Sequence, residues 1–133
     1  MSEIKLGIVV GLRADPRETI RKVAELGFPT CQVTVWNEAL LTDALADRLA
    51  AAAAEAAIEI TTIWTGMPGR YIWNFIEGPS TIGLVPEETR AMRLAVLKKG
   101  ADFAKHAGVP SITTHVGFIP ENPADPLYAG TLA

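Results

Sequence analysis

Apolar positions along the chain follow two alternating patterns, short and nearly continuous runs and longer stretches with helical spacing. Apolar runs bounded by Gly and Pro are typical of strands in a parallel sheet. The runs predict strands at Ile4–Leu12, Thr30–Val35, Glu59–Thr65 and Ser111–Gly117. Between the runs, apolar residues recur with the spacing of amphipathic helices.

Capping residues indicate where the predicted helices begin and end. Asp15 followed by Pro16 is a favoured N-cap and first helical residue, and Gly27 and Gly108 stand where helices favour a C′ glycine. The predicted helices run from Asp15 to Gly27, from Thr42 or Asp43 to Ala57, and from Pro86 to Gly108.

The predicted order, βαβαβαβ, is that of an α/β protein with a parallel sheet. Gly66–Val85 and Pro120–Tyr128 are predicted loops, the first dense in aromatic residues, and a last helix begins at Tyr128. The stretches Gly27–Thr30 and Gly108–Ser111 are alike, since each ends a helix and begins a strand. This echo supports a fold built of repeated αβ units.

The two faces of the predicted strands differ in chemical character. One face is apolar and carries Leu6, Ile8, Val10, Cys31, Val33, Val35, Ile112 and Val116. The other is small or polar and carries Gly7, Gly11, Gln32, Thr34, Thr113, His115 and Gly117. An open sheet with helices on both sides needs apolar residues on both faces. The split therefore predicts a parallel (β/α) half-barrel, four strands of a TIM-barrel-type fold, with helices on one side only.

The length of the chain bears on how such a half-barrel is completed. A closed (β/α)₈ barrel needs about 250 residues, and the chain has 133. Four strands leave two sheet edges unpaired and the inner face without its opposite wall, so Val9, Ile63 and the loop aromatics are expected to meet water. We expect a homo-oligomer or a missing C-terminal half, with the isolated chain catalytically inactive.

Charge and cysteine content narrow the range of partners. The formal net charge is -3 without blocks of like charge, so nucleic acid is not a predicted partner. Met1–Gly7 lacks a basic segment followed by an apolar core, and the alanine-rich stretch Ala44–Ala57 contains charged residues. The sequence therefore predicts a cytoplasmic protein without a membrane span. The single cysteine, Cys31, is expected to be a small buried hydrophobe.

Candidate site residues follow the predicted strands, where barrels place their active sites. His115 lies at the end of the fourth strand, as a hydrogen-bond donor, a metal ligand or a structural histidine. Trp64 ends the third strand, and the loop after it is either a lid or sugar-stacking wall or a cluster that caps the barrel. Arg70 in this loop would meet a phosphate or carboxylate, or remain a solvated cation. Trp36 follows the second strand.

Three polar residues near these positions receive no assigned role in chemistry. Glu38, close to the end of the second strand, is a weak candidate acid or base and fits an exposed loop carboxylate better. His106 lies in the last turn of a predicted helix, where a cation complements the helix dipole. Glu121 remains without a predicted function.

Two runs, WTGMPGRYIWNFIEGPSTIGLVP and THVGFIPE, resemble the xylose isomerase-like TIM-barrel superfamily, and within it the sugar-phosphate isomerase/epimerase proteins. The resemblance covers essentially the whole chain but only the N-terminal half of the family's barrel, truncated at the start of the fourth helix. It implies substrate-binding roles for His115 and Trp64, with Arg70 and Trp36 as further candidates from their positions.

The resemblance also implies the chemistry of the whole barrel. In that family a divalent metal ion (Mn²⁺, Mg²⁺, Co²⁺ or Zn²⁺) is held by Glu, Asp, His and Glu of strands five to eight. Metal-assisted proton transfer next to a carbonyl of a sugar or sugar phosphate is the implied reaction. No ligand of that set is carried by this chain, so no metal-binding residue is predicted here.

Two further functions remain open. The chain would alternatively be a non-catalytic half-barrel, a scaffold or binding module that self-associates. An endonuclease IV-like hydrolase would need a histidine cluster and a basic groove, and the two histidines and the net charge of -3 disfavour it.

Overall fold

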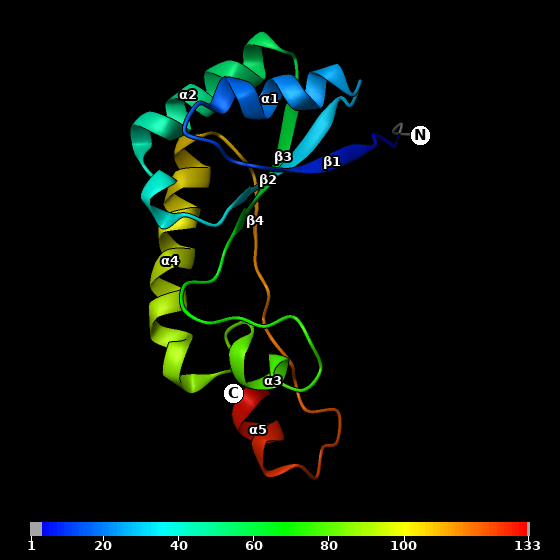
Figure 1. The fold of residues 1–133 in the computed structure, drawn as a ribbon, viewed down its shortest axis with the longest axis vertical. Helices are drawn as coiled ribbons and strands as arrows, with labels where there is room; N and C mark the ends of the chain where they lie inside the picture. Colours follow the sequence, from blue (N-terminus) through cyan, green and yellow to red (C-terminus); the bar gives the residue numbers. More distant parts are fainter. Residues whose placement is uncertain (1–3, 133) are drawn as a thin grey trace. The chain divides into compact units, whose positions relative to one another are not determined.

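The computed structural model describes residues 4–132 of the chain (Figure 1). This part divides into two compact units. Residues 4–66 and 97–113 form the first, called the sheet unit; residues 67–96 and 114–132 form the second, called the loop unit.

The sheet unit contains a four-stranded parallel sheet in the order β1-β2-β3-β4. The strands are β1 (Gly7–Gly11), β2 (Thr30–Val35), β3 (Glu59–Thr65) and β4 (Ile112–Thr113). The predicted α/β class, parallel pairing and sequential order are confirmed. The predicted fourth strand, Ser111–Gly117, is too long: beyond Thr113 the chain belongs to the loop unit, where the Val116 carbonyl accepts hydrogen bonds from the amides of Leu84 and Val85.

The helices begin close to the predicted caps. They are α1 (Pro16–Glu25), α2 (Asp43–Glu55), α3 (Gly78–Thr81), α4 (Glu87–His106) and α5 (Pro126–Leu132), with a 3₁₀ turn at Glu38–Leu40. The side chains of Asp15 and Thr42 accept hydrogen bonds from the amides of Arg17 and Leu45, as N-caps do. The short α3 and the 3₁₀ turn lie in stretches predicted as loop.

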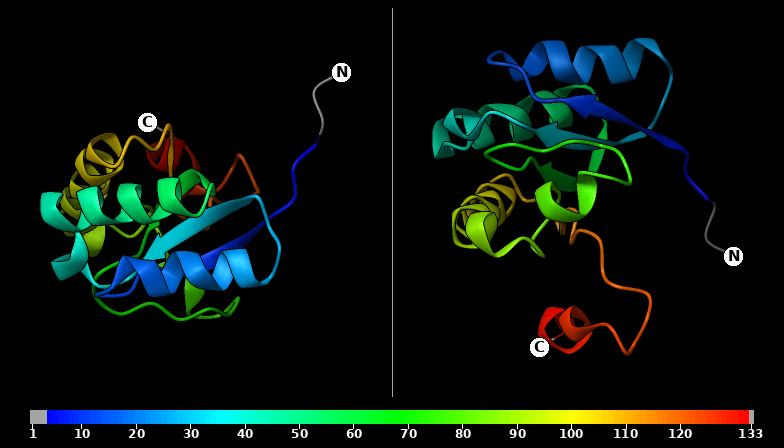
Figure 2. Two further views of the ribbon diagram at one scale, coloured as in Figure 1. Left: turned by 90° about the horizontal axis from the view of Figure 1, so that it is seen from above. Right: turned by 60° about the horizontal axis from the view of Figure 1, so that its bottom comes forward.

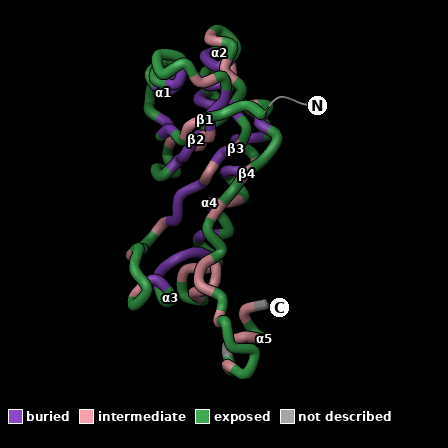
Figure 3. Tube along the Cα trace, turned by 90° about the vertical axis from the view of Figure 1, so that its right-hand side faces the viewer, coloured by how far each residue is buried: buried purple, intermediate pink, exposed green. Residues whose placement is uncertain are grey.

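One face of the sheet carries the core of the sheet unit. Its two rows are Ile8, Cys31 and Ile60, and Val10, Val33, Ile63 and Ile112. These rows pack with α1, α2 and the last turns of α4, and α1 and α2 lie side by side (Figure 2). In the sheet unit the buried stretches lie along these elements, and further buried stretches lie in the loop unit near α3 (Figure 3). The predicted apolar face is confirmed within the strands, whereas Leu6 and Val116 lie outside them and are exposed.

A β-bulge explains why β3 lacks a clean alternation of apolar and polar residues. Cys31 is paired with Ile60 but Gln32 with Thr62, so Thr61 is the extra residue. Its hydroxyl donates to the Cys31 carbonyl at 3.2 Å. The extra residue places both Ile60 and Ile63 on the packed face, and Ile63 is fully buried. The expectation that Ile63 meets water is therefore wrong.

All three helix-to-strand connections of the sheet unit have the same backbone design. After α1, the Phe28 and Gly27 amides donate to the carbonyls of Val23 and Ala24, which is the Schellman pattern. The same pair of bonds follows α2 and α4, with C′ residues Ala57 and Gly108. The φ angles of Gly27, Ala57 and Gly108 are 75°, 54° and 70°. The echo in the sequence thus reflects a repeated structural unit whose second copy carries alanine in place of glycine.

This repeat predicts that Ala57→Gly stabilises the protein. Left-handed backbone costs an L-residue about 1–2 kcal/mol, and glycine escapes this cost but loses more chain entropy on folding. We expect a net gain of about 0.5–1 kcal/mol in the free energy of unfolding. Urea unfolding followed by circular dichroism measures it. Gly108→Ala is the matched control with the opposite sign; equal and negative effects of both would contradict the strain argument.

Candidate functional site

Trp36 and Trp64 lie together where β2 and β3 end. Trp64 is in register with Thr34, on the face opposite the core, and Trp36 follows Thr34 by two residues. The two indole rings have centroids 5.9 Å apart and are tilted by 57°. Trp36 is 43% exposed, so part of the pair faces solvent. The carboxyl ends of adjacent parallel strands thus present an aromatic pair at the edge where barrels bind substrates.

The face that carries this pair, called the open face, is otherwise polar or small apart from Val9. Gln32, Thr62 and Thr34 share it with Gly11 and Thr113. The hydroxyls of Thr34 and Thr62 donate to the carbonyls of Val10 and Ser111, which pairs them within the sheet. Val9 also lies on this face and is 57% exposed, as expected for the inner wall of a half-barrel.

His115 belongs to the loop unit, two residues beyond β4. Its imidazole is exposed and meets the Trp73 ring edge-on, with centroids 4.8 Å apart and planes at 75°. Trp73 lies in the predicted aromatic loop Gly66–Val85, where the sequence alone does not distinguish it from the other aromatic residues. An edge-on partner orients the imidazole. That His115 binds a ligand stays a prediction.

Arg70 is paired within its own loop. Its guanidinium forms an ion pair with Glu77, and the Asn74 amide group donates to the other Glu77 carboxylate oxygen at 3.4 Å. Asn74 Oδ1 accepts from the amides of Ile76 and Glu77. Arg70 is therefore a neutralised cation on an ordered loop, with a partner that a ligand anion would have to displace.

His106 and Glu38, two further polar residues of the sequence analysis, are paired with side chains of α2 and α4. His106 Nε2 lies 2.9 Å from Asp47, and Lys99 lies 3.8 Å from Glu38. Burial raises the pKa of the Cys31 thiol to about 11, which keeps it protonated at neutral pH and confirms its reading as a buried hydrophobe.

The described residues do not fit the metal implied by the resemblance. Among residues 4–132, no three His, Cys, Asp or Glu side chains are grouped so that they could hold a metal ion. Nor does any described helix have the length and apolarity required to cross a bilayer.

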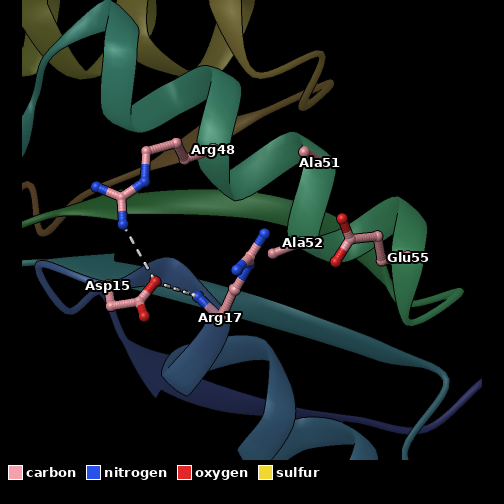
Figure 4. Close-up of a pocket in the computed structure, with 6 residues that line it drawn as sticks. All are labelled: Asp15, Arg17, Arg48, Ala51, Ala52 and Glu55. Carbon is pink, nitrogen blue, oxygen red and sulfur yellow. Dashed lines mark hydrogen bonds and ion pairs between the residues drawn. The ribbon is translucent and has the colours of Figure 1, made fainter.

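A small pocket of about 210 Å³ lies between the start of α1 and the middle of α2 (Figure 4). Arg48 forms an ion pair with Asp15 at 3.2 Å, and the same carboxylate caps the Arg17 amide. Because Asp15 already occupies the positive end of α1, this pocket is not an anion site, and it contains none of the candidate residues.

The four candidate residues thus fall into two groups. Trp36 and Trp64 meet in the sheet unit, whereas Arg70 and His115 lie in the loop unit, each with a partner there. That all four surround one substrate stays a prediction.

No family model and no curated protein matches the sequence. Among solved structures, the chain is similar to a xylose isomerase domain protein from Planctomyces limnophilus, with 31% identity and a TM-score of 0.83 over 96% of this chain. It also resembles a 3-keto-D-glucoside 4-epimerase from E. coli (21% identity, TM-score 0.55, 96% of this chain). A D-psicose 3-epimerase from Clostridium cellulolyticum gives 20% identity and a TM-score of 0.58 over 92% of this chain.

The matched region is less than half of each of these proteins, at 45%, 49% and 41% of their chains. The similarity to the two epimerases concerns the fold alone, whereas the similarity to the Planctomyces protein concerns both the fold and the sequence. Together with the sequential parallel sheet and its one packed face, these similarities show that the chain belongs to the xylose isomerase-like TIM-barrel superfamily.

Proposed function

We propose that this chain forms the N-terminal half of a sugar isomerase or epimerase barrel and supplies one wall of its sugar site. The observation that carries the proposal is the Trp36–Trp64 pair, at the carboxyl ends of adjacent parallel strands and on the open face. Indole faces pack against the C–H faces of sugar rings while leaving the hydroxyls free to hydrogen-bond. A partly exposed pair suits this use better than a role in the core.

The similar enzymes support a sugar as the substrate class. Their names state epimerisation of D-psicose and of a 3-keto-D-glucoside, and one was solved with D-tagatose. We propose a ketose or keto sugar for this site, with or without phosphate. His115 would donate a hydrogen bond to a substrate hydroxyl, and Arg70 would contribute a cation if the sugar displaced its Glu77 partner.

The proton transfer itself is assigned to residues outside this chain. Epimerisation next to a carbonyl needs a base on one face of the carbon and an acid on the other. The described residues contain no group of three His, Cys, Asp or Glu side chains that could hold a metal ion. We therefore propose that the strands closing the barrel beyond β4 bring the metal and the acid and base, and that the chain by itself binds without turnover. A cytoplasmic location also stays a prediction.

Titration with D-psicose, D-tagatose and D-fructose tests the sugar wall. We expect saturable changes in tryptophan fluorescence, and Trp64→Ala to weaken binding about tenfold, as loss of an aromatic contact of about 1.5 kcal/mol would. Leu26→Ala is the matched control, because Leu26 is 57% exposed and caps the end of α1, away from the candidate residues. Equal losses in both variants, or no saturation in the unmodified protein, would contradict the proposal.

A second function, a half-barrel that self-associates without catalysis, is favoured by exposed apolar side chains. Val9 on the open face and Phe75 and Ile76 at the loop tip are 57%, 89% and 90% exposed. Concentration-dependent sedimentation together with no sugar binding would favour this function over the first.

A further inference from the structure

Arg93 on α4 is a buried arginine whose side chain donates hydrogen bonds to main-chain carbonyls. It is 3% exposed and lies in the loop unit. Its Nε donates to the Pro68 carbonyl at 3.2 Å and its Nη1 to the Gly83 carbonyl at 2.7 Å. Its Nη2 donates to the carbonyls of Arg70 and Thr81 at 2.9 Å and 2.8 Å.

This arrangement compensates a buried charge without a counterion. No described carboxylate pairs with Arg93, and burial lowers the pKa of its guanidinium. Burying a cation costs less when its donors are satisfied, and four carbonyls accept hydrogen bonds from four of the five N–H donors of this guanidinium. Only arginine has five N–H donors in a planar fork; lysine has three on one nitrogen.

The four carbonyls lie on the two sides of one loop neck. Pro68 and Arg70 precede residues 71–80, and Thr81 and Gly83 follow them. The Ile72 amide donates to the Thr81 hydroxyl at 3.1 Å, which ties the same two sides together. Arg90, one turn earlier on α4, donates to the carbonyls of Leu84 and Val85, both at 2.7 Å. The loop is thus fastened at its base by one helix face.

The clamped loop carries residues of the candidate site. Arg70 lies at the neck of this loop. Its carbonyl accepts a hydrogen bond from Arg93, and its side chain forms an ion pair with Glu77. Trp73, the edge-on partner of His115, lies within residues 71–80. The amides of Asn74, Ile76, Glu77 and Gly78 all have acceptors inside the loop. Holding the neck therefore sets where both Arg70 and the Trp73–His115 contact lie.

We infer that Arg93 is a positioning residue that clamps the neck of the 71–80 loop and holds Arg70 and Trp73 in a fixed arrangement, ready to serve as a preformed wall if a sugar binds at this loop. That the ligand is a sugar rests on the proposed function, whereas the clamp rests on the hydrogen bonds of Arg93 alone. It decides between the two functional readings of this loop, a mobile lid and a fixed wall, in favour of the wall.

Hydrogen exchange and chemical rescue test the clamp. In Arg93→Ala, we expect the amides of residues 71–80 to exchange about 100-fold faster, which corresponds to losing hydrogen bonds to a charged group. Exchange in β2 and β3 should be unchanged. Ethylguanidinium at millimolar concentration should restore protection, whereas sodium chloride at equal ionic strength should not. Lys98→Ala, an exposed cation on the same helix, is the control and should have no effect on this loop.

Arg93→Lys keeps the positive charge, and it tests the clamp if Arg93→Ala does not fold. The clamp predicts fast exchange in residues 71–80 of Arg93→Lys as well, with β2 and β3 still protected. Unchanged loop protection in Arg93→Lys, loss of protection throughout the chain in both variants, or no rescue of a folded Arg93→Ala would each overturn the inference.

Sugar titration separates the clamp from the proposed function. If the loop is a preformed wall, a variant in which only about a tenth of molecules hold it in place should bind the sugar about tenfold more weakly. Loop exchange that speeds up without any change in sugar affinity would keep the clamp and remove the loop from the site. If the unmodified protein binds no sugar, the proposed function fails while exchange and rescue still decide the clamp.

Discussion

Gly83→Ala is expected to destabilise the loop unit by about 3 kcal/mol, the sum of backbone strain and steric overlap. Gly83 has a φ of 79°. A Cβ atom added there would lie 2.2 Å from the Val116 carbonyl oxygen and 2.3 Å from the Gly117 nitrogen. Both are backbone atoms, so no side-chain rotation relieves the overlap, and the pairing of Leu84 and Val85 with Val116 would be lost.

Gly27→Ala separates strain from overlap at this position. Gly27 has nearly the same φ, 75°, but no atom lies within 4 Å of an added Cβ. It should lose only about 1 kcal/mol, the strain alone. Urea unfolding followed by circular dichroism measures both variants. Similar losses in the two variants would show that Val116 and Gly83 are not in close contact.

Gly100→Ala is expected to destabilise the protein by about 2–3 kcal/mol, although alanine normally stabilises a helix interior. Gly100 lies within α4, in the part of this helix that belongs to the sheet unit. An added Cβ would lie 1.9 Å from the Cγ2 methyl of Thr65 at the end of β3. The close approach of helix to strand therefore reverses the sign of the intrinsic propensity.

A double-mutant cycle identifies the contact. Thr65→Ser removes the Cγ2 methyl, so the alanine methyl of Gly100→Ala can occupy the vacated space. We expect the double variant to recover most of the loss, with a coupling energy of about 2 kcal/mol. Gly130→Ala in α5 is the control, since nothing lies within 4 Å of an added Cβ there; it should be neutral or stabilising. Additive effects of Gly100→Ala and Thr65→Ser would contradict the packing.

Several features of the fold follow from local signals in the sequence. Asp15 and Thr42 cap helices because their side chains reach amides only two or three residues ahead. Gly27 and Gly108 end helices because glycine tolerates a positive φ. The one-sided apolar pattern of β1 and β2 made the half-barrel predictable, and the Trp36–Trp64 pair follows from two strand ends in parallel register.

Other features depend on contacts between distant residues, and there the sequence was less informative. The bulge at Thr61 changes the alternation of β3 after Ile60, and nothing in the order of residues marks it. The sequence predicts His115 at a strand end, but the strand stops at Thr113 because Val116 pairs with the loop at Leu84 and Val85. In the sequence Trp73 is one of several aromatic residues, and only the structure shows its contact with His115.

The sequence by itself determined the class, the order and the boundaries of most elements, together with the positions of Trp36 and Trp64 close to strand ends. Helix caps, C′ glycines and apolar periodicity act over a few residues, and a sequence records them directly. Only the tertiary structure showed that Arg93 contacts both sides of the 71–80 loop. Its four acceptors are main-chain carbonyls from residues 10 to 25 positions away. Every residue has a main-chain carbonyl, so no residue type in the sequence could have identified these four acceptors in advance.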